Sequence, residues 1–257
     1  MTFSLRRGLV GMLLLAPACE APKGEAECPA GRVLAGGIQY DSLWSATESG
    51  AGGTVTVCEG VFPGDDYIAA ITDIHVQGAG AEQTKFNGEA GSAEEAASVH
   101  ALATYVVGSL SLSGVTLTGG ASWRDAYDSG GAAGGLWLGV TLATLSDVEI
   151  RDNVADWGGG VAVWPDLPDG SRPEVTVSDS RIVRNTASWG GGAFALTGPS
   201  TVTLVNVDLG MDTDGNGPDD IAFFDGEPDG DSHEPVAVYQ FDGVVSVTCV
   251  WETRTCE

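Results

Sequence analysis

Basic residues are scarce in this sequence, which has 11 Lys and Arg against 36 Asp and Glu in 257 residues. The resulting net charge of −25 repels nucleic acids and anionic membrane surfaces, so we expect neither as a partner. A self-repelling surface also leads us to expect a monomer. Two interpretations of the charge stay open: a soluble surface without a specific ligand, and a surface that binds divalent cations.

Apolar runs long enough to span a membrane are also lacking. The run near the N-terminus covers residues 9–16, directly after Arg6 and Arg7, and is too short to cross a bilayer as a mature helix. A basic start, a short apolar run and small residues are typical of a secretory signal peptide, which we assign to residues 1–18. The sequence therefore predicts export.

Cys19 follows this segment, and the junction has two interpretations. Ala16-Pro17-Ala18 fits cleavage by the ordinary signal peptidase. The same stretch resembles a bacterial lipoprotein signal, in which the cysteine after the cleavage site is lipidated, although Ala16 stands where that signal usually has Leu. We favour lipidation of Cys19, because it leaves an even number of cysteines. Residues 19–32 would then be a lipid-anchored linker of an outer-membrane lipoprotein; without the lipid the protein would be extracellular.

The four remaining cysteines can form two disulfides in the oxidising environment outside the cytoplasm. Three pairings are possible for Cys28, Cys58, Cys249 and Cys256. We predict Cys28–Cys58 and Cys249–Cys256, which join neighbours in the sequence near each end of the mature chain.

Helical periodicity is nearly absent, and one apolar frame recurs instead. It occupies residues 110–120, 143–153, 175–185 and 202–212, with apolar residues two apart, a break of three, and usually two more. Spacings of 33, 32 and 27 residues separate Leu112, Leu145, Val177 and Leu204. Alternation of period two predicts strands, and repeats of this length predict a solenoid. We expect one all-β domain over residues 33–257, with about seven or eight coils.

A second motif is written twice, 32 residues apart, as "IRDNVADWGGG" and "IVRNTASWGGG". Equivalent residues of stacked coils lie about 4.8 Å apart, so Asn153 would stack on Asn185 as a side-chain amide ladder and Trp157 would lie near Trp189. The glycines would form a tight corner that needs positive φ: Gly158, Gly159, Gly160, Gly190, Gly191 and Gly192. The alternative is that the tryptophans form an aromatic platform for sugars.

These motifs resemble the paired repeats of polymorphic outer membrane proteins, in which an aromatic-x-x-Asn motif precedes Gly-Gly-Ala and an aliphatic residue. That resemblance implies a right-handed parallel β-helix. The segment "GGIQYDSLWSATESGAGGTVTVCEGVF" is similar to the start of secreted pectin-lyase-like β-helices. There, a short helix, here about residues 40–48, covers the strand edges at the open end of the solenoid.

The densest acidic segment is "DTDGNGPDD", which resembles the first half of an EF-hand calcium loop. Asp212, Asp214, Asn216 and Asp220 could bind Ca²⁺ through their oxygens. Phe223 stands where the EF-hand has a bidentate Glu, so the affinity would be weak. An acidic turn without a metal is the other interpretation.

No residue is assigned a catalytic role. Many β-helix enzymes act on polysaccharides, but the Gly-His-Gly and Arg-x-Lys motifs of polygalacturonases are missing. His75 is expected on the solvent side of a strand, and neither His100 nor His233 has metal-ligand spacing to another histidine. The carboxylate pairs Asp152 with Asp156 and Asp125 with Asp128 could act as acid and base, or could only keep the loops soluble.

Two functions follow. The first is a non-enzymatic, adhesin-like binding or structural role toward a carbohydrate or another cell-surface component. The alternative is a polysaccharide-active lyase or glycoside hydrolase that uses loop carboxylates.

Overall fold

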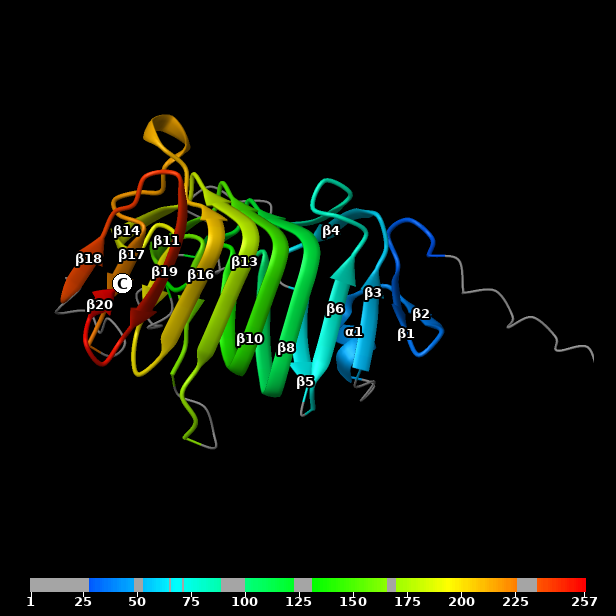
Figure 1. Cartoon of the computed structure of the whole chain (residues 1–257). Helices are drawn as coiled ribbons and strands as arrows, with labels where there is room; N and C mark the ends of the chain where they lie inside the picture. The colour runs from blue at the N-terminus through cyan, green and yellow to red at the C-terminus, as the bar shows by residue number, and fades with distance from the viewer. Residues whose placement is uncertain are drawn as a thin grey trace, which may run out of the picture.

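A computed structural model describes residues 28–48, 53–64, 66–70, 72–88, 100–122, 131–165, 170–225 and 235–257. This part of the chain is almost entirely β-structure, with one helix, α1 (Leu43–Glu48), and a single 3-10 turn at Asp212–Asp214. The strands stack into a solenoid-like, mostly parallel sheet, as predicted (Figure 1). Within the described residues, no helix is both long and apolar enough to span a membrane.

The solenoid has three long faces, and each coil contributes one strand or part of a strand to each. The first face holds β5 (Asp66–Ala70), the start of β8 (Leu102–Thr118), the start of β10 (Leu136–Arg151), β12 (Val161–Val163), β15 (Phe194–Leu196) and β17 (Ile221–Phe223). The second holds β3 (Gly53–Val57), β6 (Ile74–Gly78), the middle of β8 and β10, β13 (Glu174–Val183) and β16 (Thr201–Asp208). The third holds β4 (Gly60–Pro63), β7 (Thr84–Asn87) and the ends of β8, β10 and β13.

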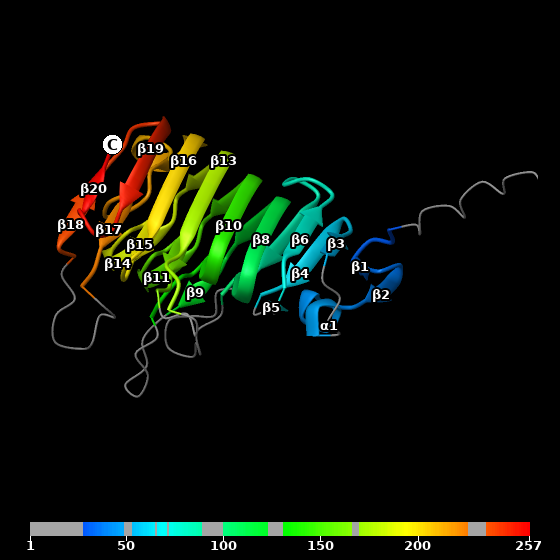
Figure 2. The same ribbon diagram turned by 60° about the horizontal axis from the view of Figure 1, so that its bottom comes forward.

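A separate short sheet closes each of the later coils. It consists of β9 (Ala121–Ser122), β11 (Val154–Trp157) and β14 (Thr186–Gly190), which pair in parallel. Figure 2 shows this sheet beside the long faces.

The predicted apolar frame is confirmed by the register of the second face. Leu112 pairs with Leu145, Leu145 with Val177, and Val177 with Leu204. All four side chains are buried, as expected when alternate residues of each strand point into the core. Among the described residues, however, only β3, β6, β8, β10, β13 and β16 stack in parallel on this face, so seven or eight coils was an overestimate.

Antiparallel strands occupy both ends of the stack. At the N-terminal end β1 (Val33–Ala35) pairs antiparallel with β3 and forms a hairpin with β2 (Ile38–Tyr40). Helix α1 packs against β5, and Asp66 caps it by accepting the N–H groups of Leu43 (2.8 Å) and Trp44 (2.9 Å). The helix is thus shorter than predicted and shares the covering of the strand edges with the hairpin.

At the C-terminal end β18 (Ala237–Tyr239) pairs antiparallel with β17, and β19 (Val244–Val250) pairs antiparallel with β16. The last strand, β20 (Thr255–Cys256), turns back on β19. Both predicted disulfides are present, Cys28–Cys58 at one end and Cys249–Cys256 at the other. Each cross-link therefore holds a terminal segment against the stack.

Removal of the disulfides should destabilise the two ends unequally. Replacing Cys28 and Cys58 by Ser should lower the free energy of unfolding more than replacing Cys249 and Cys256, because the first bond spans 30 residues and the second only 7. Each loss should be about 2–4 kcal/mol. Urea unfolding of both double variants measures the order, and the reverse order would contradict the loop-closure argument.

Candidate functional site

A buried ladder of asparagine amides runs between the third face and the short sheet. Asn153 Nδ2 donates to Asn185 Oδ1 (2.9 Å), and Asn185 Nδ2 donates to Asn216 Oδ1 (3.0 Å). The backbone N–H groups of Asn153 and Asn185 donate to the same oxygens. The sequence reasoning paired the first two residues and missed the third rung, although Asn216 follows Asn185 at a similar interval of 31 residues.

The remaining polar groups of the ladder are also satisfied. Each amide group also donates a hydrogen bond to a backbone carbonyl of the preceding coil. The acceptors are Leu117 for Asn153, Ile150 for Asn185 and Ile182 for Asn216. The series ends at Asp220, whose buried carboxylate accepts from Asn216, Gln240 and the backbone of Phe241. Because a buried polar group without a partner is destabilising, this closed network specifies the register of the coils.

Truncation of the central rung should therefore be severe. Asn185→Ala removes an acceptor and a donor pair and leaves buried groups of Asn153 and Asn216 without partners, which should lower the stability by about 3 kcal/mol or more. The exposed control Gln77→Ala should stay within about 0.5 kcal/mol. Chemical unfolding compares the two, and a similar small effect of both would show that the ladder does not fix the fold.

The repeated tryptophans do not occupy equivalent positions. Trp157 pairs with Gly190 and not with Trp189, because the register of β11 and β14 shifts after Ala155. The Trp157 ring is fully buried and contacts Trp164 (ring centroids 6.2 Å apart) and Phe224 (6.3 Å). We call these residues the outer aromatic cluster; its members are Ala132, Ala133, Trp137, Trp157, Ala162, Trp164, Trp189, Ala195, Ala222 and Phe224.

The glycines of the repeat have two different roles. Gly158, Gly190 and Gly191 have positive φ, as predicted. At Gly159, Gly160 and Gly192 the φ angle is ordinary, and a Cβ atom would instead lie within 2.7 Å of the backbone of the next coil. Close approach of the coils, and not backbone conformation, therefore requires glycine at these last positions.

The predicted calcium ligands have other partners in the structure. Asp214 pairs with Arg184 (3.2 Å) and Arg181 (3.3 Å), Asn216 and Asp220 belong to the amide ladder, and Asp212 is exposed. The described residues contain no group of three or more His, Cys, Asp or Glu that could hold a metal ion. The calcium site stays a sequence-based prediction, and no proposal below uses it.

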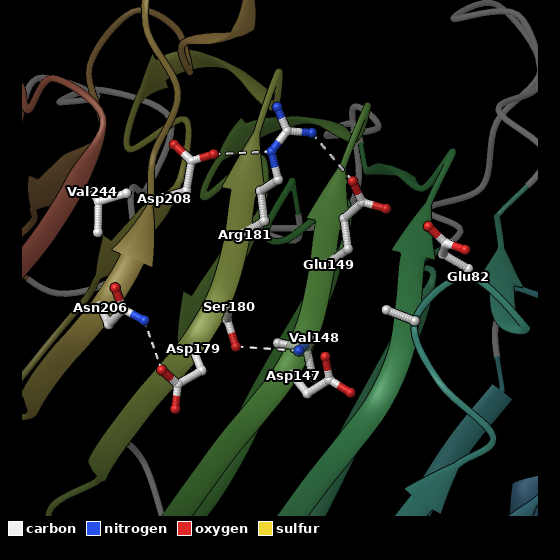
Figure 3. A pocket seen from close by; sticks show the side chains of 11 residues that line it. Glu82, Asp147, Val148, Glu149, Asp179, Ser180, Arg181, Asn206, Asp208 and Val244 are labelled. Carbon is white, nitrogen blue, oxygen red and sulfur yellow. Dashed lines mark hydrogen bonds and ion pairs between the residues drawn. The ribbon is translucent and has the colours of Figure 1, made fainter.

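A shallow groove of about 520 Å³ lies along the corner between the second and third faces (Figure 3). Its ion pairs cross from coil to coil: Arg181 on β13 contacts Asp208 on β16 (3.0 Å) and Glu149 on β10 (3.4 Å). Asp147 and Asp179 occupy the corner itself with positive φ, which Asp tolerates better than most residues. Carboxylates outnumber the single guanidinium, so the groove is acidic.

Asp152 and Asp156, one of the suggested acid and base pairs, have different surroundings. Asp152 forms ion pairs with Arg184 (2.7 Å) and Arg151 (2.5 Å), and its hydrogen bonds to these residues hold the pKa of the carboxyl below its usual value. Asp156 is buried. Asp125 and Asp128 lie outside the described residues.

The structure describes two of the three histidines, His75 and His100. His75 points to solvent from β6, as predicted. A ring nitrogen of His100 lies 2.5 Å from the carbonyl oxygen of Ala133. His233 and the proposed lipidation site Cys19 lie outside the described residues.

Asp219 is the carboxylate that sequence reasoning missed. Burial raises the pKa of Asp219 to about 6, the N–H of Gly191 lowers it by donating to the carboxylate (2.7 Å), and the charge of Asp220 raises it. The charged form is thus disfavoured in the folded protein, and stability falls as the pH rises from about 4 to about 6.

Asp219→Asn should abolish this pH dependence. Asn keeps an oxygen acceptor for the N–H of Gly191 and carries no charge. The variant should therefore melt about 2–4 °C above the wild type at pH 7.5. This corresponds to a gain of roughly 1 kcal/mol in the free energy of unfolding, after allowance for solvent screening. At pH 4 the difference should vanish. Calorimetry at both pH values tests this, with exposed Asp147→Asn as the control; an equal gain at both pH values would contradict a titration effect.

Comparison with known proteins gives no relative: no protein family, no curated protein and no solved structure matches the chain.

Proposed function

We propose that this protein is an exported, lipid-anchored protein of the cell envelope with a non-enzymatic binding or structural role. The basic and apolar start of the chain and Cys19 support export and anchoring. The resemblances to polymorphic outer membrane repeats and to pectin-lyase-like proteins support the right-handed form of the solenoid and a place at the cell surface.

The observation that carries the non-enzymatic role is the pairing of Asp152, Glu149 and Asp208 with arginines. A general acid needs a pKa near the working pH, whereas the pKa of Asp152 is lowered by Arg184 and Arg151. Glu149 and Asp208 both form ion pairs with Arg181, which joins three neighbouring coils.

A carbohydrate or another cell-surface component is the proposed ligand class. Trp137, Trp164 and Trp189 are only partly buried in the outer aromatic cluster. Partly exposed tryptophans offer an apolar ring face, which suits the apolar face of a sugar ring.

The alternative, a polysaccharide-active enzyme, is favoured by Asp219 alone. A half-buried carboxyl with a pKa of about 6 can act as a general acid. Incubation of the wild type and Asp219→Asn with polysaccharides, followed by analysis of released products, tests this alternative. Product release that is lost in the variant would replace the binding role by catalysis.

Anchoring is tested by Cys19→Ser. The wild type should be found in the membrane fraction of the native host, and the variant should be soluble or unprocessed, because the lipid is attached to the thiol. Mass spectrometry of the mature N-terminus provides the second measurement. Soluble wild-type protein with an unmodified Cys19 would contradict the anchor while leaving the binding role to be judged by a glycan-array screen of the mature protein.

A further inference from the structure

The outward side of the second face carries two straight rows of side chains. The register of β3, β6, β8, β10, β13, β16 and β19 aligns them one above another, and Figure 1 shows these strands side by side. The first row is Thr54, His75, Ser111, Thr144, Thr176, Thr203 and Thr248, and the second is Thr56, Gln77, Ser113, Ser146, Ser178, Val205 and Ser246. We call this surface the hydroxyl face.

The two rows of the hydroxyl face have no charged residue, although 18% of the chain is charged and the net charge is −25. The next outward row of the same strands contains exposed Glu174, between Leu142 and Thr201. Apart from His75, Gln77 and Val205, every position of the two rows is Ser or Thr. All these side chains are exposed or half-buried, while the residues between them, such as Leu145 and Val177, are fully buried. The two rows thus form a stripe of uncharged hydrogen-bonding groups, bordered on one side by Glu174.

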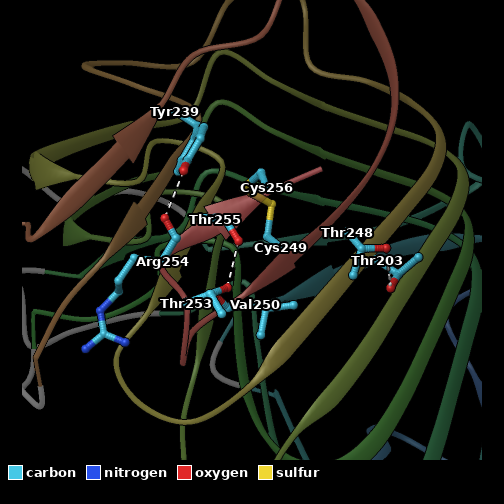
Figure 4. The surroundings of a disulfide bond; sticks show 9 residues. All are labelled: Thr203, Tyr239, Thr248, Cys249, Val250, Thr253, Arg254, Thr255 and Cys256. Atoms are coloured by element: carbon cyan, nitrogen blue, oxygen red, sulfur yellow. Dashed lines mark hydrogen bonds between the residues drawn. A yellow bond between two sulfur atoms is a disulfide. The ribbon is translucent and has the colours of Figure 1, made fainter.

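The spacing of the hydroxyl groups is set by the sheet. Neighbouring strands lie about 4.8 Å apart, and alternate residues along a strand lie about 6.6–6.8 Å apart. At one end of the first row, Thr203 and Thr248 hydroxyls contact one another at 3.3 Å, as Figure 4 shows. In the described structure, the central hydroxyls of Thr144 and Thr176 have no protein partner, so each can donate one hydrogen bond and accept two.

We propose that the hydroxyl face binds the surface of a neutral polysaccharide whose chains are packed side by side. This inference rests on the proposed binding function and assigns its site and partner. Charge complementarity selects the partner: the neutral face lies on a strongly acidic protein, which repels anionic polymers, while cationic ligands would be drawn to the acidic groove at Asp147 and Asp179.

The shape of the face selects an extended partner. A small ligand is usually held in a concave pocket that buries most of its surface, whereas these rows lie on a broad sheet. Hydroxyl groups repeated in two directions can make many weak hydrogen bonds to a surface that also repeats, and the sum of many weak contacts gives a useful affinity.

The experiment measures depletion of the exported protein by microcrystalline cellulose and by chitin, which are neutral and have chains packed side by side. Thr176→Glu places a charge at the centre of the first row and should raise the dissociation constant about tenfold, equivalent to about 1.4 kcal/mol. The matched control Thr213→Glu adds the same charge at an exposed position of the 3-10 turn and should stay within about twofold.

Two further variants separate binding from folding. Thr176→Ser keeps the hydroxyl and should bind as the wild type does. The triple variant Thr144→Val, Thr176→Val and Thr203→Val keeps the shape and the strand preference of the side chains, so it should melt near the wild-type temperature and still lose binding by about tenfold.

Several results would overturn the inference. These are equal effects of Thr176→Glu and Thr213→Glu, retention of binding by the triple valine variant, and failure of the wild type to bind either polysaccharide. Adsorption to ice crystals, measured as thermal hysteresis, without binding to either polysaccharide would assign ice as the ligand of the hydroxyl face. That result would also overturn the inference. A glycan-array signal for a soluble glycan in the absence of binding to the insoluble polymers would leave the proposed function standing.

Discussion

The buried amide ladder of Asn153, Asn185 and Asn216 is the interaction on which the rest of the structure depends. A slip of one residue between parallel strands would turn every inward side chain outward. The hydrophobic pattern disfavours such a slip, because the slip would expose apolar side chains, but it does so through the sum of many non-directional contacts. The ladder adds a specific constraint, because each amide has to lie directly above the next for its hydrogen bonds to form. The register then places all other side chains in rows.

Rows of equivalent residues about 4.8 Å apart restrict where an acidic chain can put its charges. Like charges directly opposite one another are destabilising in a sheet. One row beside the corner solves this by alternation, with Arg181 between Glu149 and Asp208. Two rows of the second face carry uncharged side chains instead, with Glu174 in the row beside them, on a protein of net charge −25. The proposed binding role therefore depends on this distribution of charge and not on a single pocket.

Much of this architecture could be predicted from the sequence, because the apolar frame and the Asn-Trp-Gly motif are written more than once. Asn216 was missed as a rung since it lies within an Asp-rich segment that also resembles a calcium loop. The partners of Trp157 could not be predicted, because one shift in strand register separates it from Trp189. The ion pairs of Arg181 and Arg184 depend on the directions in which their side chains point. The raised pKa of Asp219 depends on burial in the folded protein.

Native-state hydrogen exchange tests the central role of the ladder most directly. The backbone N–H groups of Gly120, Asn153 and Asn185 each donate to a side-chain oxygen of the ladder. If the ladder fixes the register, these amides should exchange with one common free energy of opening, equal to that of global unfolding. Fast exchange at any of them, at the rate of an exposed loop amide, while the strand amides stay protected, would contradict this account.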